Sequence, residues 1–310
     1  MLRFDDSLID LAAAYGGSEQ KRGVLLNGEP WMLKLSDRLK ENQLNSSYSN
    51  STISEYVCCH IIELIGVDVQ KTEIGYLHRW SDYHGKVIDD LVVACKNFVE
   101  NGWALVEFKP LANTILPNKM GKIPKISELN AVFSENVYFT SEFAKVARDR
   151  YWDTFVLDAF LGNFDRHGNN WGYLICRADR SIELAPIYDC GSCLFPQISD
   201  NGIETVLQNK SEIEKRVLEF PSAALLLEDG KKANYYKFIN SGDCLECNEA
   251  LLRVVPKINL KEIKGFIHSL DFISEVRREF YCMMLEHRLN EILLPQFKRL
   301  CNGSRAMDCF

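Results

Sequence analysis

The apolar residues in the first part of the chain are spaced as in a hairpin followed by a helix. Apolar runs on both sides of Asn27-Gly28 predict a β-hairpin over residues 24–34, and Lys34 falls at the end of its second strand. Between residues 52 and 65, apolar side chains recur at i, i+3, i+4 and i+7, which predicts an amphipathic helix that ends at Gly66. The region between hairpin and helix is polar and rich in Asn and Ser, so we expect a loop there.

Two shorter apolar runs, at residues 74–77 and 91–98, predict further strands. The pattern then changes. Apolar positions predict a helix over residues 143–161 that ends at Gly162. Short strands are expected at residues 172–176 and 182–184, on either side of a turn, so that they form a small hairpin.

Residues 208–300 are expected to form helices with short connections, including a long helix over 272–294 that Pro295 stops. The whole pattern predicts an α+β fold with two lobes. Residues 1–97 would form a small mixed α/β N-terminal lobe, and residues 98–310 a larger, mainly helical C-terminal lobe.

Composition excludes several classes of protein. The chain has 310 residues, of which 46% are hydrophobic and 25% charged, as in an ordinary globular protein. Its net charge of -7 offers no basic surface for nucleic acid or for anionic lipid. No apolar run approaches the roughly 18 residues of a membrane span, and no signal peptide is evident. We therefore expect a cytoplasmic protein that binds neither nucleic acid nor membrane, with delivery to a host cell as an effector left open.

The cysteines predict reduced thiols rather than a disulfide framework. Their number, eleven, is odd, and they are scattered along the chain. Cys244 and Cys247 form a C-x-x-C pair, but no second pair of zinc ligands follows nearby. We expect these two thiols to lie at the start of a helix.

Three polar residues carry the candidate chemistry. Asp165 and Asn170 follow the helix that ends at Gly162, and Asp189 comes after the small hairpin, which brings it back toward them. Polar turns of this kind often have no function. Here, however, a carboxylate, an amide and a second carboxylate occur in the order that phosphoryl transfer requires in protein kinases. Asp165 would be the catalytic base, and Asn170 and Asp189 would bind Mg²⁺, which prefers such oxygen ligands.

The N-terminal lobe offers matching phosphate-binding groups. In kinases a strand lysine holds the phosphates and pairs with a helix glutamate, which are the roles expected here for Lys34 and Glu55. Each has an ordinary alternative: a solvated lysine at a strand end, and a carboxylate that favours the start of a helix. Residues Gly16-Gly17-Ser18 would let backbone approach a phosphate, although they match neither a Walker A sequence nor the full kinase glycine loop.

Two segments resemble the HipA-like serine/threonine kinases. The catalytic loop of that family is similar to Gly162-Asn-Phe-Asp-Arg-His-Gly-Asn-Asn170, and its metal turn is similar to Leu184-Ala-Pro-Ile-Tyr-Asp-Cys-Gly191. Residues 15–17, 48–56 and 92–98 resemble the short CtkA-type branch more than HipA itself. Together the resemblance covers most of residues 10–300.

The resemblance implies a two-lobed kinase fold with ATP in the cleft. It implies that His167 and Tyr188 line the nucleotide site and that Val93, Ala94, Cys95 and Lys96 form a hinge strand whose backbone meets adenine. From its chemistry alone, His167 could donate to a phosphate oxygen or tie the loop together. HipA has a further N-terminal region that contacts its antitoxin, whereas this chain begins almost at the glycine turn. A HipB-like partner bound in the same way is therefore not expected.

We predict an ATP- and Mg²⁺-dependent serine/threonine protein kinase that acts on protein hydroxyls and is capable of autophosphorylation. Two alternatives stay open. Lipid kinases use a similar Asp-Arg-His-x-x-Asn loop, so the acceptor could be a lipid or another small molecule. The protein could also be a nucleotide-binding scaffold without turnover, although every expected chemical group is present.

Overall fold

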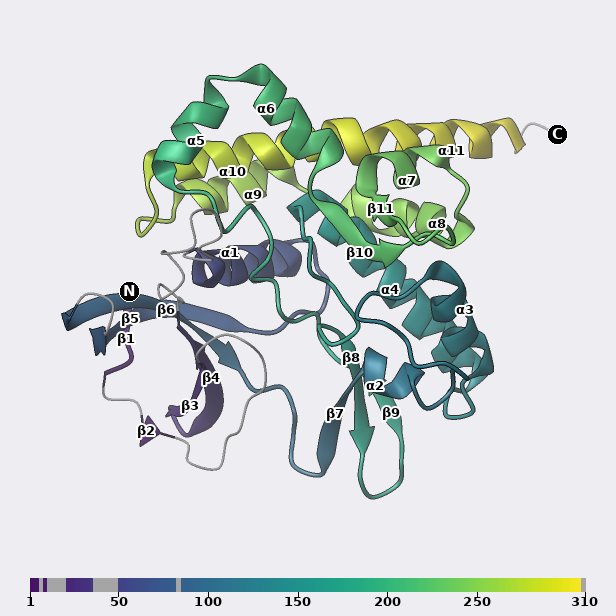
Figure 1. The fold of residues 1–310 in the computed structure, drawn as a ribbon, viewed down its shortest axis with the longest axis horizontal. Coiled ribbons are helices and arrows are strands. Elements are labelled where there is room, and N and C mark those ends of the chain that lie inside the picture. The colour runs from purple at the N-terminus through teal and green to yellow at the C-terminus, as the bar shows by residue number, and fades with distance from the viewer. Residues whose placement is uncertain (6–7, 10–20, 36–49, 82–84, 308–310) are drawn as a thin grey trace.

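The protein folds into a sheet-containing N-terminal lobe and a mainly helical C-terminal lobe (Figure 1). The computed structural model describes residues 1–5, 8–9, 21–35, 50–81 and 85–307. No helix among these residues is both long and apolar enough to cross a bilayer. The α+β fold agrees with the prediction from the sequence, and the boundary near residue 97 stays a prediction.

The N-terminal lobe is built on a six-stranded sheet with the order β1-β5-β6-β4-β3-β2. Only the β1–β5 pairing is parallel within the described sheet. Its strands are β1 (Leu2–Arg3), β2 (Leu8–Ile9), β3 (Lys21–Leu26), β4 (Glu29–Lys34), β5 (Thr72–Ser81) and β6 (Lys86–Lys96). The predicted hairpin is confirmed as β3–β4. Asn27 and Gly28 both have positive φ, as its two-residue turn requires.

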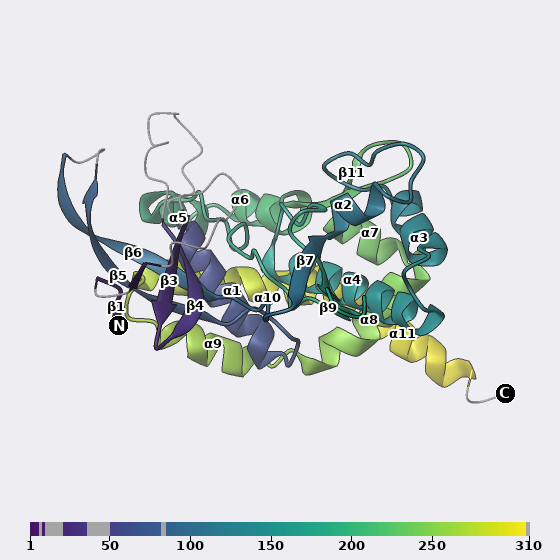
Figure 2. The same cartoon turned by 90° about the horizontal axis from the view of Figure 1, so that it is seen from below.

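Helix α1 (Ser51–Leu64) lies between the sheet and the C-terminal helices, as Figures 1 and 2 show. Its buried face belongs to the large hydrophobic core of the molecule, whereas the opposite face of the sheet has a small core of its own. Gly66 adopts a left-handed conformation, and the N–H groups of Gly66 and Val67 donate to Glu63 and Ile62. The predicted end of this helix is confirmed.

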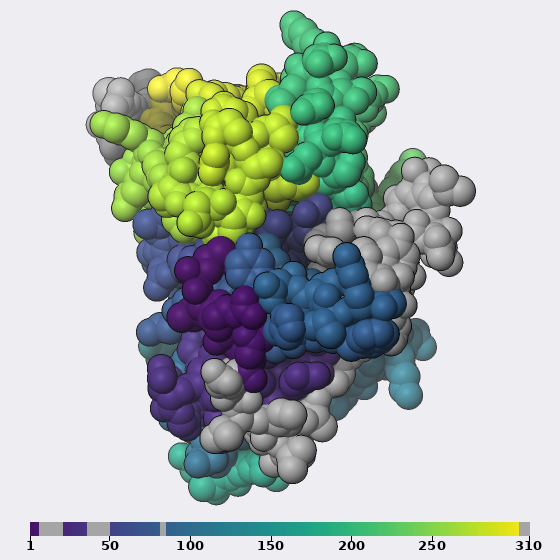
Figure 3. Space-filling model, turned by 90° about the vertical axis from the view of Figure 1, so that its left-hand side faces the viewer, coloured from purple at the N-terminus to yellow at the C-terminus, as the bar shows by residue number. Residues whose placement is uncertain are grey.

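The C-terminal lobe surrounds helix α4 (Ser141–Leu161), which packs against α8 (Leu245–Val254). Its other helices are α2 (Phe108–Ala112), α3 (Ile126–Glu135), α5 (Asp200–Leu207), α6 (Lys210–Glu214), α7 (Tyr235–Ser241), α9 (Leu260–His268), α10 (Glu275–Arg288) and α11 (Leu294–Met307). Short π-helical or 3-10 turns cover Lys215–Glu219, Val255–Lys257 and Leu289–Leu293. In Figure 3 the yellow-green helical surface lies directly above the purple and blue surface of the N-terminal lobe.

The prediction that Pro295 ends the long helix is wrong. Helix α10 passes through a π-helical turn, Leu289–Leu293, into α11, and Pro295 is the second residue of α11. Leu294, just before the proline, has a helical conformation and donates its N–H to the oxygen of Leu289, five residues earlier, so Pro295 lies within a continuous helical path. The π turn shifts the hydrogen-bond ladder just before it.

Small strands in the C-terminal lobe position the loops of interest. The hairpin of β8 (Gly172–Cys176) and β9 (Ile182–Leu184) has the predicted bounds. The sequence did not predict β7 (Trp103–Glu107), which pairs with β8. It also missed the hairpin of β10 (Ser222–Leu226) and β11 (Lys232–Asn234) within a region expected to be helical.

Candidate active site

The three candidate catalytic residues lie on two neighbouring loops. Helix α4 ends at Gly162, whose φ of 70° turns the chain into the loop that carries Asp165 and Asn170. The β8–β9 hairpin then returns the chain to Asp189. The structure thus brings together the two loops that the sequence predicts to converge.

Arg166 holds the two loops against each other. Its buried guanidinium binds both carboxylate oxygens of Asp158 on α4, at 3.0 and 3.2 Å. Its Nη1 donates to the main-chain oxygen of Asn170 at 3.0 Å and to that of Tyr188. The same nitrogen lies 3.4 Å from the main-chain oxygen of Asp189. One arginine therefore fixes the distance between the predicted base loop and the predicted metal turn.

Asp158 extends this network to the start of the catalytic loop. It accepts a hydrogen bond from Asn163 Nδ2 at 2.9 Å, and Asn163 Oδ1 accepts from the backbone N–H of Asp165 at 3.0 Å. The hydroxyl of Tyr235 donates to the main-chain oxygen of Asn163 at 2.8 Å. All of these groups except the Asp165 amide belong to buried residues, so buried hydrogen bonds fix the start of the catalytic loop.

Lys34 joins the two lobes at the centre of the site. Its Nζ lies 2.9 Å from Glu55 Oε2 on α1 and 2.9 Å from Asp189 Oδ1. Burial raises the pKa of Glu55 to about 7 against the opposing effect of Lys34. Burial would also raise the pKa of Asp189, but Lys34, together with Lys21 and Arg166, lowers it to about 2. Asp189 is therefore a permanent anion at neutral pH. Glu55 lies one residue beyond the first turn of α1, so its main partner is Lys34 rather than the helix dipole.

Asp165 is the more accessible carboxylate of the site. Its side chain is 38% exposed, with Lys122 Nζ 3.6 Å from Oδ1 and His167 Nε2 3.7 Å from Oδ2. Burial lowers the pKa of His167, and the nearby Asp165 only partly offsets this effect. His167 Nδ1 accepts a hydrogen bond from the backbone N–H of Asn169 at 3.2 Å. This bond places the proton of the neutral ring on Nε2, toward Asp165.

Asn170 has its amide group oriented by the loop. Its Nδ2 donates to the main-chain oxygen of Asp165 at 2.7 Å, so Oδ1 is the atom that can serve as a ligand. Asp189 likewise uses Oδ1 for Lys34, which leaves Oδ2. Two hard oxygen donors on loops joined by Arg166 fit a small divalent cation.

Gly191 allows the metal turn to approach α1 closely. A Cβ atom at this position would lie 3.1 Å from Glu55 Oε2 and 3.4 Å from the main-chain oxygen of Ser51. The Glu55 carboxylate is held by Lys34 and has little freedom to move. The Asp-x-Gly pattern thus has a packing reason here in addition to its resemblance to kinases.

Gly191→Ala should therefore lower the free energy of unfolding by about 1 to 3 kcal/mol, the usual cost of overpacking. It should also weaken nucleotide binding, because the added methyl group pushes Glu55 away from Lys34. Gly265→Ala on α9 is the control for the added methyl group: a Cβ there meets nothing within 4 Å, and because alanine favours a helix it should be as stable as the wild type or up to about 1 kcal/mol more stable. Denaturant unfolding checks this, and a Gly191→Ala variant as stable as the wild type would contradict the packing argument.

The four predicted hinge residues lie at the end of β6. Val93, Ala94 and Cys95 pair with β4 on one side and with β5 on the other. A strand between two neighbours uses its backbone groups in both ladders, so little of this backbone is left for adenine. Val93 is opposite Lys34, and its side chain therefore shares the lysine's face of the sheet. Lys96 pairs with Glu29 at 2.8 Å on the surface.

An aromatic pair follows the end of β6. The rings of Phe98 and Tyr188 are 5.5 Å apart between centroids and inclined by 33°. The hydroxyl of Tyr188 is buried and has no hydrogen-bond partner in the part of the chain that the structure describes. Phe98 is thus a second aromatic residue beside Tyr188, which the sequence predicts to line the nucleotide site. Gly16, Gly17 and Ser18 lie outside the described residues.

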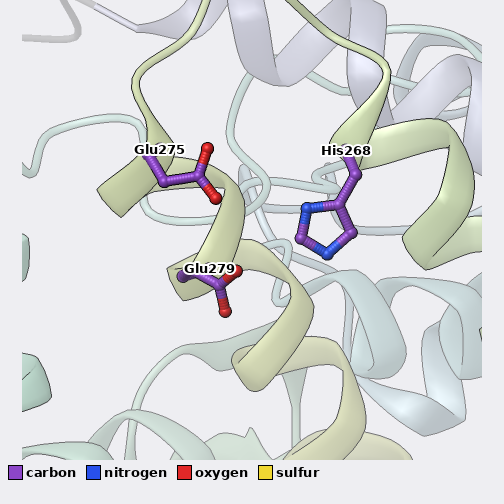
Figure 4. Close-up of side chains that lie close together, drawn as sticks. All are labelled: His268, Glu275 and Glu279. Atoms are coloured by element: carbon purple, nitrogen blue, oxygen red, sulfur yellow. The ribbon is translucent and has the colours of Figure 1, made fainter.

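A second group of potential metal ligands lies elsewhere on the C-terminal lobe. His268, at the end of α9, faces Glu275 and Glu279 on α10 (Figure 4). All three are exposed, and exposed acidic groups of this kind occur commonly without a metal. Cys244 is the N-cap of α8 and Cys247 lies in its first turn, so the expected position at a helix start is confirmed. The ten cysteines of the described residues are free thiols.

Several residues of the site were not predicted from the sequence. Asp158, Asn163 and Tyr235 support the catalytic loop, and Lys122 reaches it from the segment between α2 and α3. Only Asp158 carried a signal, because a carboxylate among the apolar residues of a buried helix needs a partner. The others depend on contacts between distant parts of the chain.

The two-lobed fold and the Lys34, Glu55, Asp165 and Asp189 arrangement define a kinase-like protein. The chain belongs to the family described as "HipA-like C-terminal domain", whose model matches residues 13–239. It is 37% identical over 280 residues to the serine/threonine-protein kinase CtkA of Helicobacter pylori, which covers 90% of this chain and 82% of the relative.

One solved structure agrees with this assignment, and a second agrees with the fold. The crystal structure of the H. pylori proinflammatory kinase CtkA matches with a TM-score of 0.83 and 33% identity, over 98% of this chain and 99% of that one. HipA from Shewanella oneidensis, solved with HipB and operator DNA, matches with a TM-score of 0.52 and 14% identity. That match covers 90% of this chain and 64% of the other, and it supports the fold alone. The predicted family and kinase-like fold are confirmed.

Proposed function

We propose that this protein is a serine/threonine protein kinase that transfers the γ-phosphate of ATP to a protein hydroxyl. The observation that carries the proposal is the position of Lys34. It pairs with both Glu55 and Asp189 at 2.9 Å, beside a loop that presents Asp165 and Asn170. These are the parts, in the same spatial order, that phosphoryl transfer uses in protein kinases.

Each residue has a role that follows from its surroundings. Asp165 is accessible and accepts the proton of the attacking hydroxyl. Asn170 Oδ1 and Asp189 Oδ2 would hold the divalent cation, which we propose to be Mg²⁺ because both donors are hard oxygens. When bound, that cation neutralises charge on the phosphates. Lys34 would hold the phosphates, and Glu55 keeps its ammonium group in place.

The adenine base would lie where the two lobes meet, at the end of β6. Phe98 and Tyr188 provide aromatic surface there, and the side chains of Val93 and Cys95 lie on the lysine's face of the sheet. The N–H groups of Asn97 and Val99 donate to the Pro30 oxygen and to Asn97 Oδ1. We therefore propose that the main-chain carbonyl oxygens of residues 97–99 contact adenine. Roles for His167 and for Gly16, Gly17 and Ser18 beside the phosphates stay predictions from the sequence.

The acceptor and partners are proposed from the relatives and the charge. CtkA is named as a serine/threonine-protein kinase, which favours protein hydroxyls, including those of the enzyme itself, over lipid. The HipA relative was solved with HipB and operator DNA. For this chain, with a net charge of -7, we propose neither a nucleic-acid ligand nor a HipB-like partner.

The acceptor class is tested by offering ATP labelled at the γ-phosphate together with a mixture of proteins and, in parallel, phosphoinositide vesicles. We expect label on serine or threonine of protein, dependent on a divalent cation. Label on lipid alone would assign the protein to the lipid kinases. Nucleotide binding with no labelled product on any acceptor would favour a scaffold without turnover.

A further inference from the structure

We propose that Lys122 is a further catalytic residue, whose ammonium group contacts the γ-phosphate beside Asp165 during transfer. The inference rests on the proposed kinase function and adds to its site a cation from outside the catalytic and metal loops. Lys122 lies on the segment between α2 and α3, more than 40 positions before Asp165 in the sequence. Its Nζ is 3.6 Å from Asp165 Oδ1.

The backbone of the same segment is attached to the catalytic loop. The N–H of Gly168 donates to the main-chain oxygen of Lys122 at 3.3 Å, and the N–H of Lys109 donates to the oxygen of Gly168 at 2.7 Å. Gly168 is enclosed between these elements: a Cβ atom there would lie 2.9 Å from Lys109 Cβ and 2.9 Å from Met120 Cε. Lys122 is thus attached to the middle of the Asp165–Asn170 loop.

Residues on both sides of Lys122 are fixed. The buried Met120 donates its backbone N–H to Asn113 Oδ1 at 2.7 Å. On the other side, the oxygen of Pro124 accepts from Leu226 N at 2.8 Å, and Lys125 N donates to Glu128 Oε2 at 2.7 Å. A lysine on an unanchored loop would have no defined position. Here hydrogen bonds at Met120 on one side and at Pro124 and Lys125 on the other fix the backbone that carries Lys122.

The other cationic side chains near Asp165 are bound to other partners. Arg166 is buried and bound to Asp158 and to three main-chain oxygens. Lys34 is held by Glu55 and Asp189. His167 Nε2 lies 3.7 Å from the other carboxylate oxygen of Asp165, Oδ2, and its Nδ1 accepts a hydrogen bond from the Asn169 N–H. The Lys122 side chain, 64% exposed, lies against the accessible carboxylate oxygen Oδ1 of Asp165.

A cation at this position would reduce the repulsion between negative charges that the reaction brings together. The acceptor oxygen forms a bond to the γ-phosphorus while the bond from that phosphorus to the β–γ bridging oxygen breaks, and its electron pair leaves with ADP. The acceptor proton passes to Asp165. The Asp165 carboxylate and the phosphoryl oxygens therefore approach each other as like charges. The ammonium group of Lys122 beside Asp165 would offset the charge of both, as positioned hydrogen-bond donors stabilise charge in the transition states of other enzymes.

The test compares Lys122→Gln and Lys122→Arg with Lys119→Gln, a matched control on the same exposed segment. Autophosphorylation rates are measured with γ-labelled ATP, and dissociation constants are measured for ADP and for the non-hydrolysable β,γ-imido analogue of ATP. We expect Lys122→Gln to lower the transfer rate about 100-fold, as loss of one such donor does, with partial recovery in Lys122→Arg. Binding of the analogue should weaken, and binding of ADP should not. Lys119→Gln should match the wild type.

The outcomes separate this inference from the proposed function. An active wild type with an equally active Lys122→Gln variant would overturn the role of Lys122 and leave the kinase assignment standing. Parallel loss of ADP and analogue binding, or a lowered melting temperature in both Lys122 variants, would show a structural role instead and also overturn it. A wild type without any transfer would refute the proposed function itself.

Discussion

Asp165→Asn should lower the rate of phosphate transfer by about three orders of magnitude, within the range for loss of a general base. The amide can still accept a hydrogen bond from the acceptor hydroxyl, but it cannot take up its proton. The change should leave the fold intact because the loop is held through the main chain of this residue. Its N–H donates to Asn163 Oδ1 and its carbonyl accepts from Asn170 Nδ2. Single-turnover measurements with labelled ATP give the rate.

The control for this variant is its affinity for ADP with a divalent cation. Asp165 is not among the proposed metal ligands, so the affinity should stay within a few-fold of the wild type. A variant that retains near-normal transfer would show that Asp165 is not the base. A variant that also loses ADP binding would show that the loop has moved.

Arg166→Leu should lower the free energy of unfolding by about 3 to 5 kcal/mol, the usual cost of breaking a buried ion pair. The substitution leaves the buried Asp158 carboxylate with Asn163 as its remaining side-chain partner. It also removes the bonds from Nη1 to the main chain of the metal turn. Transfer activity should fall as well, because the two loops lose their common anchor. Denaturant unfolding monitored by tryptophan fluorescence measures the stability.

The pH dependence of this loss identifies its cause. Burial raises the pKa of Asp158 in the folded protein, and Arg166 opposes that effect. Without Arg166 the pKa rises further, so the folded state binds a proton more tightly than the unfolded state. The stability deficit should then be largest above neutral pH and smaller near pH 5. The double variant Arg166→Leu/Asp158→Leu should recover part of the loss. A deficit independent of pH, with no recovery, would exclude an unpaired Asp158 as the cause.

The sequence was sufficient where local chemistry decides the structure. Asn27-Gly28 specifies its hairpin turn through positive φ angles, and Gly162 ends α4 for the same reason. Only the short β8–β9 hairpin separates Asn170 from Asp189. The sequence therefore sufficed to predict that Asp165, Asn170 and Asp189 lie close together.

Long-range contacts explain what the sequence did not predict. Strand β7 is recognised only by its pairing with β8, and Lys122 meets Asp165 only through tertiary structure. The backbone of Val93 to Cys95 is engaged by β4, which lies about 60 positions earlier in the sequence. Pro295 was misjudged because proline usually stops a helix, whereas here the π turn Leu289–Leu293 changes the hydrogen-bond ladder just before it and the helix continues.

The most direct test of the central claim is a comparison of phosphopeptides from cells that express the wild type or Asp165→Asn at equal levels. The account predicts serine and threonine phosphorylation that depends on Asp165, including sites on the enzyme itself. Identical phosphopeptides in the two samples, with both proteins folded and able to bind ADP, would contradict the assignment as a protein kinase.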